Sequence, residues 1–133
     1  MNECIFCKIA NGEIPSATLY EDELFRVILD LGPATKGHAL ILPKTHAANL
    51  YELPDETAAK ALVLAKKMAI KMKKGLGCDG LNLVQNNEEA AGQTVPHFHI
   101  HMIPRTAGDH AGISWKPGKL TDEIREEILE KVR

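Results

Sequence analysis

The sequence lacks the features of membrane, exported and nucleic-acid-binding proteins. No apolar run approaches the roughly 20 residues that a membrane-spanning helix needs, and the start of the chain (MNECIFCKIANGE) is too polar for a signal peptide. Sixteen Lys and Arg against eighteen Asp and Glu give a net charge of −2, which offers no broad positive surface for nucleic acid or anionic lipid. We therefore expect a cytoplasmic protein that binds neither membranes nor nucleic acid.

Cysteine is also scarce, and the chain has no internal repeat, no low-complexity stretch and no linker. Without an export signal, its three cysteines are expected to be reduced thiols or metal ligands. The chain has 133 residues, 44% of them hydrophobic and 26% charged, which is typical of a globular domain that folds without disulfides. We expect a single domain over residues 1–133.

Short β-type runs separated by turn residues predict a sheet. After a short helix or turn near the N-terminus, within residues 1–16, the strands are expected at 18–21, 24–29, 38–43, 80–87 and 97–103. The strands follow one another as in hairpins, with one long helical segment between them. This order indicates an α+β domain with a largely antiparallel sheet.

The long helix is expected to begin at Pro54-Asp55 and to end near Lys74, with Gly75 as its C-cap. Its apolar residues at helical spacing predict one buried stripe, made of Leu62, Ala65, Ala69, Met72 and Leu76. A short charged helix is expected over residues 121–132, with its apolar residues on one side.

Six histidines are the unusual feature of the composition, and His97, His99 and His101 lie within five residues. Side chains alternate along a strand, so these three imidazoles are expected to share one face. A neutral imidazole is a usable nucleophile near pH 7, and a protonated neighbour stabilises negative charge on phosphoryl oxygens. The alternatives are a solvated strand without function and a three-histidine metal site, although the three groups spread over roughly 13 Å of strand.

The segment HFHIHMI fits the pattern His-φ-His-φ-His-φ-φ, in which φ is apolar, and with it the chain resembles the histidine triad (HIT) family of nucleotide hydrolases and transferases. The resemblance covers roughly residues 4–116 and includes CIFCKIANGEIPSATLYEDE, LD at 29–30, GHALILPKTH at 37–46, QNN at 85–87 and AGQTVPHFHIHMIPR at 91–105. It is to the small nucleotide-binding branch, of the bacterial zinc-containing type. It implies a five-stranded antiparallel meander sheet with one long and one or two short helices, extended across a homodimer.

The resemblance also implies the roles of individual residues. His99 matches the histidine that attacks the α-phosphorus and forms a covalent nucleotidyl intermediate, which water then hydrolyses. His101 and His38 match histidines that assist at the phosphate, and Asp30 matches the carboxylate that binds the ribose hydroxyls. The positions implied to line the phosphate are Asn86, Gly92, Gln93 and Thr94. Those implied to surround the base are Phe6, Ile14, Leu31 and Leu40.

The implied activity is hydrolysis of nucleoside 5′-phosphoramidates or acyl-adenylates, with a purine nucleotide as substrate or AMP as product. Two alternatives stay open from the sequence. One is a hydrolase of dinucleoside polyphosphates. The other is a nucleotide-binding or partner-binding module whose catalysis is incidental.

Cys4 and Cys7 form a CxxC motif, which alone is either a redox pair or half of a zinc site. A redox pair is expected at a helix N-terminus in a βαβ unit, and the N-terminal sequence offers no such pattern. His46 and His97 are the candidates to complete a zinc site, and the resemblance implies a structural Zn²⁺ on these two cysteines and two histidines. Cys78, His110, Trp115 and the C-terminal helix are assigned no role.

Overall fold

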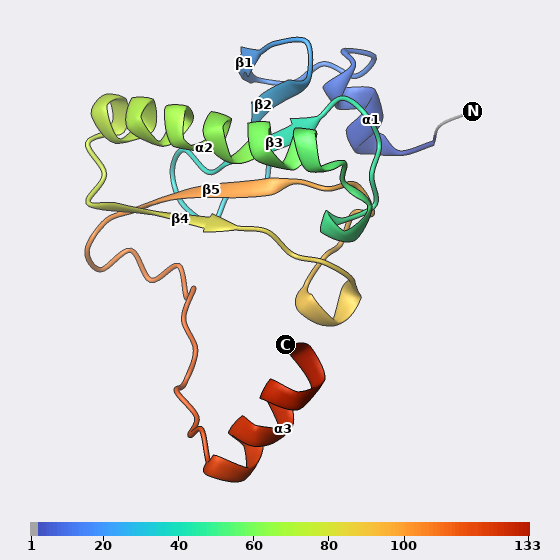
Figure 1. The fold of residues 1–133 in the computed structure, drawn as a ribbon. Coiled ribbons are helices and arrows are strands. Elements are labelled where there is room, and N and C mark those ends of the chain that lie inside the picture. Colours follow the sequence, from blue (N-terminus) through green and yellow to red (C-terminus); the bar gives the residue numbers. More distant parts are fainter. Residues whose placement is uncertain (1–2) are drawn as a thin grey trace.

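One antiparallel sheet of five strands organises the fold (Figure 1). The computed structural model describes residues 3–133, so residues 1 and 2 of the expected domain lie outside the described residues. The strands are β1 (Thr18–Glu21), β2 (Phe25–Leu29), β3 (Ala39–Pro43), β4 (Gly80–Val84) and β5 (Ile100–Arg105). The helices are α1 (Ile5–Ala10), α2 (Asp55–Leu76) and α3 (Asp122–Val132), with 3₁₀ turns η1 (Leu50–Glu52) and η2 (Glu89–Ala91). The expected α+β fold with one long and two short helices is confirmed.

The strand order is β1-β2-β3-β5-β4, and every neighbouring pair is antiparallel. A simple meander was expected, but it holds only for β1 to β3. β3 and β4 are both antiparallel to β5 and therefore run parallel to each other. Parallel strands need a long crossover connection, which α2 supplies, and β5 returns between them.

The buried face of helix α2 differs from the expected one. Its buried residues are Ala61, Leu64, Ala65, Met68 and Met72, whereas Leu62 is 63% exposed and Leu76 is 46% exposed. The helix carries apolar residues on more than one face, so periodicity alone could not select the face that packs on the sheet. The helix also ends later than expected, because Gly77 rather than Gly75 adopts the left-handed cap conformation (φ 64°) and donates its N–H to the Lys73 carbonyl.

The histidine segment is only partly strand. β5 begins at Ile100 rather than at position 97, and β4 ends at Val84, which pairs with His101. Before β5, the N–H of Phe98 donates to the carbonyl of Ala47 at 2.7 Å, outside the sheet ladder. The expected start of the strand at position 97 is therefore wrong, whereas the expected alternation is confirmed: Phe98, Ile100 and Met102 lie in the main core, and the rings of His97 and His99 contact Phe6 on the other side. His97 lies in a bend before the strand, which frees its side chain for a different site from that of His101.

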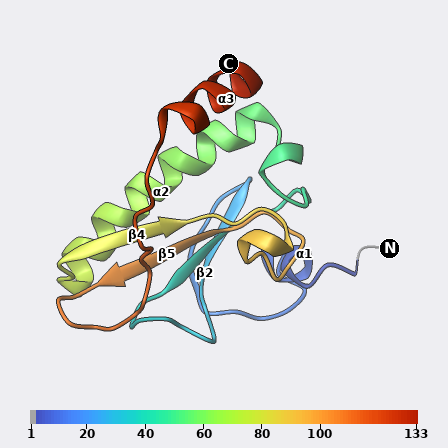
Figure 2. The ribbon, with the colours of Figure 1, turned by 90° about the horizontal axis from the view of Figure 1, so that it is seen from below.

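Side chains of the strands alternate between two apolar clusters. Val27, Ile41 and Met102 pack on the α2 side of the sheet, in the main core. Ile28, Leu40 and Leu42 point the other way and form a second cluster with Ala10, Phe6 and Ile9 of α1. Figure 2 shows α2 lying along one side of the sheet. None of the helices within residues 3–133 is long and apolar enough to span a membrane.

The observed buried face of α2 predicts unequal effects on stability for two nearby leucines. Leu64→Ala is expected to lower the free energy of unfolding by about 2–4 kcal/mol, because Leu64 is buried against the sheet. Leu62→Ala is the matched control and, at protein concentrations low enough that self-association does not contribute, is expected to change it by less than about 0.5 kcal/mol. Urea denaturation measures both, and a larger loss for Leu62→Ala than for Leu64→Ala would contradict the packing described here.

Candidate active site and metal centre

Three histidines meet on the α1 side of the sheet. His99 precedes β5, His101 lies in β5, and His38 immediately precedes the neighbouring β3. The His101 ring lies 4.9 Å from the His99 ring and 5.1 Å from the His38 ring, centroid to centroid. The Asp30 carboxylate lies 3.5 Å from His38 Nε2. The structure thus brings together four residues that the sequence resemblance implied at the reacting phosphate and the ribose.

Hydrogen bonds determine which ring nitrogens carry protons. The backbone N–H of Ala34 donates to His38 Nδ1 at 2.9 Å, so a neutral His38 carries its proton on Nε2. That Nε2 lies 2.9 Å from His101 Nδ1, which therefore accepts and leaves the His101 proton on Nε2.

His99 has the opposite arrangement. Its Nδ1 donates to the carbonyl of His97 at 2.7 Å, which leaves Nε2 unprotonated. Adjacent rings thus offer a nucleophilic nitrogen on His99 and an N–H donor on His101. This pairing suits displacement at phosphorus, which needs an attacking lone pair and a donor for the leaving group.

Burial keeps these imidazoles neutral. It lowers the pKa of His38 and of His99, in each case partly offset by the Asp30 carboxylate. Burial, together with electrostatic repulsion from His99 and His38, lowers the pKa of His101 to about 4, in spite of the opposing effect of the Asp30 carboxylate. At pH 7 and without a ligand, the His101 donor is therefore a neutral imidazole N–H rather than the imidazolium that the sequence suggested.

A cavity of about 420 Å³ opens beside His99 and His101. Most of its lining is apolar, and Ser16, Asp30, Thr94 and the two histidines provide the polar side chains. The four residues predicted around the base all line it: Phe6, Ile14, Leu31 and Leu40. The Phe6 ring contacts the His99 ring edge to face, at 5.0 Å between centroids. One mainly apolar cavity with polar groups on its wall is typical of a small-molecule site.

Of the four residues predicted at the phosphate, only Thr94 lines the cavity. The Gln93 amide donates to the carbonyls of Ala48 (2.6 Å) and Val95 (2.9 Å), and its oxygen accepts the Glu88 N–H. Gln93 therefore braces the loop after η2. Gly92 adopts φ 98°, and an added Cβ would lie 3.5 Å from the amide nitrogen of Asn86. Gly92 and Asn86 therefore pack against each other beside Gln93.

Sequence reasoning missed several groups in the site. Ile9, Ser16 and Ile28 line the cavity, and the Ala34 N–H sets the protonation of His38. Ile9 lies three residues after Phe6 on α1, so helical spacing was a usable signal for it. Nothing in the sequence marked the backbone of Ala34.

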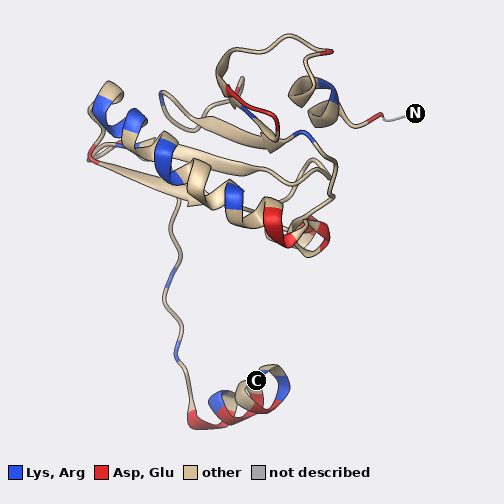
Figure 3. Ribbon diagram, turned by 45° about the horizontal axis from the view of Figure 1, so that its top comes forward, with Lys and Arg blue, Asp and Glu red and all other residues tan. Residues whose placement is uncertain are grey.

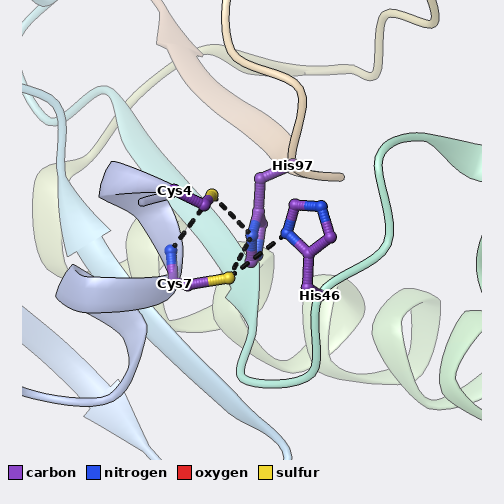
Figure 4. A group of neighbouring side chains, drawn as sticks. All are labelled: Cys4, Cys7, His46 and His97. Atoms are coloured by element: carbon purple, nitrogen blue, oxygen red, sulfur yellow. Dashed lines mark hydrogen bonds between the residues drawn. The ribbon is translucent and has the colours of Figure 1, made fainter. Parts of the chain in front are cut away.

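The second cluster joins four side chains from three segments that are distant in sequence (Figure 4). Cys4 caps α1, Cys7 lies within α1, His46 follows β3 and His97 precedes β5. Cys7 Sγ lies 3.2 Å from His46 Nδ1 and 3.3 Å from His97 Nδ1, and Cys4 Sγ lies 3.4 Å from His97 Nδ1. One donor atom from each residue falls within 4.8 Å of all the others.

This donor set fits one tetrahedral metal ion. Donor atoms bound to a common Zn²⁺ lie roughly 3.3–3.8 Å apart, close to the sulfur–nitrogen distances given above. His97 is completely buried, and its Nε2 lies 2.9 Å from the Pro43 carbonyl, which accepts the ring N–H and leaves Nδ1 facing the thiols. A backbone carbonyl behind a ligating histidine is the usual support of a metal site.

Comparisons with known proteins agree with this geometry. The family model of the HIT domain matches residues 11–108. The adenosine 5′-monophosphoramidase of Schizosaccharomyces pombe is 41% identical over 135 residues, which cover 98% of each chain. A crystal structure of a HIT family member from Bacillus subtilis has a TM-score of 0.89 and 42% identity, covering 97% of this chain and 94% of that one. A Zn-bound histidine triad protein from Mycobacterium smegmatis has a TM-score of 0.79 and 41% identity, over 87% and 84% of the two chains.

The low pKa of His101 predicts a dependence of stability on pH. Below about pH 6.5 the unfolded chain binds a proton at this residue, whereas the folded chain binds one only near pH 4. The free energy of unfolding is therefore expected to fall by up to about 3 kcal/mol as the pH drops through this range. Urea denaturation at pH 7 and pH 4.5 measures the loss, which His101→Gln is expected to reduce. An equal loss in the variant would contradict the assignment.

Proposed function

Because the chain belongs to the HIT domain family, we propose that it is an enzyme that hydrolyses nucleoside 5′-phosphoramidates or acyl-adenylates at the α-phosphate. The observation that carries the proposal is the orientation of His99. Its Nδ1 is held by the His97 carbonyl, so that Nε2 keeps a free lone pair on the wall of the cavity. The phosphoramidase activity in the name of the 41% identical relative supports the reaction class.

In the first step, His99 Nε2 attacks the α-phosphorus and forms a phosphorus–nitrogen bond as the bond to the leaving group breaks. The leaving nitrogen or oxygen takes a proton from His101 Nε2–H. The anionic phosphate of a bound substrate favours a His38–His101 pair that holds one additional proton, across the 2.9 Å between His38 Nε2 and His101 Nδ1, so both rings are neutral after this transfer. In the second step, water attacks the nucleotidyl-histidine, and its proton returns to the histidine pair. The products are a nucleoside monophosphate, the released amine or acid, and free His99.

The cavity supports the binding of one nucleotide. Its apolar part, with Phe6, Ile14 and Leu40, suits a purine base, and Asp30 can accept hydrogen bonds from ribose hydroxyls. Asp30 is also held in place, since its Oδ1 accepts the Gly32 N–H at 2.8 Å. The alternative of a dinucleoside polyphosphate substrate has no specific contact in its favour.

We further propose that Cys4, Cys7, His46 and His97 hold a structural Zn²⁺. With four protein ligands, the ion would have no open position for a substrate, so its contribution would be to fix α1 against the histidine segment. His97 connects the two sites. Its ring belongs to the metal set, and its carbonyl orients the nucleophilic ring of His99.

A homodimer is also part of the proposal. β4 lies at one edge of the sheet, and an edge strand offers unpaired backbone groups to another strand. Beside it, an apolar groove of about 570 Å³ lies between α2 and β4, lined in part by Leu62, Val63 and Leu83. These features support the joining of two sheets through β4, with the groove covered by the second copy.

The nucleophile is tested by substitution. His99→Ala is expected to lower kcat for an adenosine phosphoramidate by at least about 1000-fold, because no other group can form the intermediate, while AMP binding stays within a few fold. The exposed His110, at φ 57°, provides the matched control His110→Asn, which is expected to keep full activity because asparagine tolerates this backbone conformation. Turnover in His99→Ala near the wild-type rate would contradict the proposal. The same assay with a diadenosine polyphosphate separates the two substrate classes.

The metal is tested by its stoichiometry and its effect on stability. The purified protein is expected to hold one Zn²⁺ per chain after dialysis, and chelation is expected to lower Tm, because the ion links α1 to the histidine segment. Cys7→Ser is expected to lose both the zinc and the response to chelator, whereas Cys78→Ala, outside the cluster, keeps both. Zinc-free protein in which Cys4 and Cys7 react readily with thiol reagents would overturn the proposed site.

A further inference from the structure

Helix α3 has an apolar side that its own chain does not cover. None of its described residues, 122–132, is buried, and Ile124 and Ile128 are each about half exposed. The helix is locally well formed, with the Thr121 hydroxyl accepting the Ile124 N–H and two carboxylates in its first turn. A helix of eleven residues is nevertheless marginal in water unless a packed apolar face supports it. The apolar side of α3 therefore needs another surface to pack against.

A hydrogen-bonded turn follows β5 where the chain leaves the sheet. Arg105, at the end of β5, donates twice to Asp109 (2.7 Å each) and once to Asn82 on β4 (2.9 Å). Asp109 in turn accepts the N–H groups of Thr106 and Ala111. This turn leads the following segment past β4, so that α3 lies beyond that edge of the sheet (Figure 1).

The charge of α3 is opposite to that of α2 (Figure 3). α3 carries five carboxylates and two basic residues, a net charge of −3. α2 carries six lysines and two carboxylates, a net charge of +4. Opposite charges on two surfaces favour their association and fix its orientation.

A groove on α2 carries lysines at the same spacing as the glutamates of α3. It has a volume of about 310 Å³ and is lined by Tyr20, Leu64, Lys67, Met68, Ile70 and Lys71. Ile70 is 60% exposed, and Lys67 and Lys71 flank it at i, i+4. On α3, Glu123 and Glu127 have the same i, i+4 spacing beside Ile124 and Ile128. The groove lies on the β1 side of α2, away from β4, so the proposed pairing through β4 leaves it open.

We propose that α3 docks into this groove on the α2 of a second copy of the chain, and that the two copies exchange their C-terminal helices. Ile124 and Ile128 lie against Ile70, and Glu123 and Glu127 face Lys67 and Lys71. The tail leaves the sheet past β4, and α3 lies on the side where a second copy is proposed to pair. The exchange adds a second contact to the proposed pairing at β4 and does not depend on the reaction.

Reciprocal charge reversal tests the exchange. One chain carries Glu123→Lys and Glu127→Lys, and a second chain carries Lys67→Glu and Lys71→Glu. All four positions are exposed, and circular dichroism checks that both variants fold. Each variant alone places like charges against each other and is expected to weaken self-association at least tenfold in sedimentation equilibrium.

Mixing the two variants is the decisive step. In a mixed dimer both contacts regain opposite charges, so the mixture is expected to form a 1:1 heterodimer of near wild-type affinity. Lys60→Glu with Lys74→Glu is the control, with the same charge change on α2 outside the groove, and is expected to weaken association less than threefold.

Two results would overturn the exchange. If each variant associates as tightly as the wild type, α3 takes no part in the association of two copies, whether or not they pair through β4. If the mixture forms no heterodimer while one chain with all four substitutions behaves as the wild type, α3 docks on its own chain. Phosphoramidate turnover, measured in parallel, reports separately on the proposed reaction.

Discussion

The site depends on one hydrogen bond, from His99 Nδ1 to the backbone carbonyl of His97. An imidazole has one proton when neutral, and giving it to a carbonyl on one side leaves a lone pair on the other. The bond is 2.7 Å long and buried, so water does not compete for it. It can form because the chain at position 97 has not yet entered the sheet, and the carbonyl is free of the strand ladder.

The position of His97 links the rest of the structure to this bond. Its ring nitrogens contact the Pro43 carbonyl at the end of β3 and the two cysteine sulfurs of α1. The same ring therefore ties the sheet, the N-terminal helix and the nucleophile's support together. A metal on the cysteines would stiffen this connection from outside the cavity, without any contact with the substrate. His97 thus contributes both to the stability of the fold and to the orientation of the nucleophile.

Much of this could be predicted from the sequence, for identifiable reasons. Alternation of apolar residues predicted the strands, and the helix start followed from Pro54-Asp55. The resemblance to the family brought His38, His99 and His101 together and united Cys4, Cys7, His46 and His97, as the distances bear out. Other features depend on tertiary packing. The buried face of α2 is chosen by the sheet, the Ala34 N–H reaches His38 through the fold of a loop, and Gln93 braces a loop whose partner, Ala48, is distant in sequence.

The central claim is that His99 Nε2 is the atom that attacks phosphorus. The most direct test is to mix enzyme with an adenosine phosphoramidate, stop the reaction in alkali within one turnover, and locate the nucleotidyl group by mass spectrometry of peptides. The account predicts an added adenylyl group on the ring of His99 and on no other residue. An adenylyl group on His101 or His38, or full turnover with no labelled peptide at any time point, would contradict it.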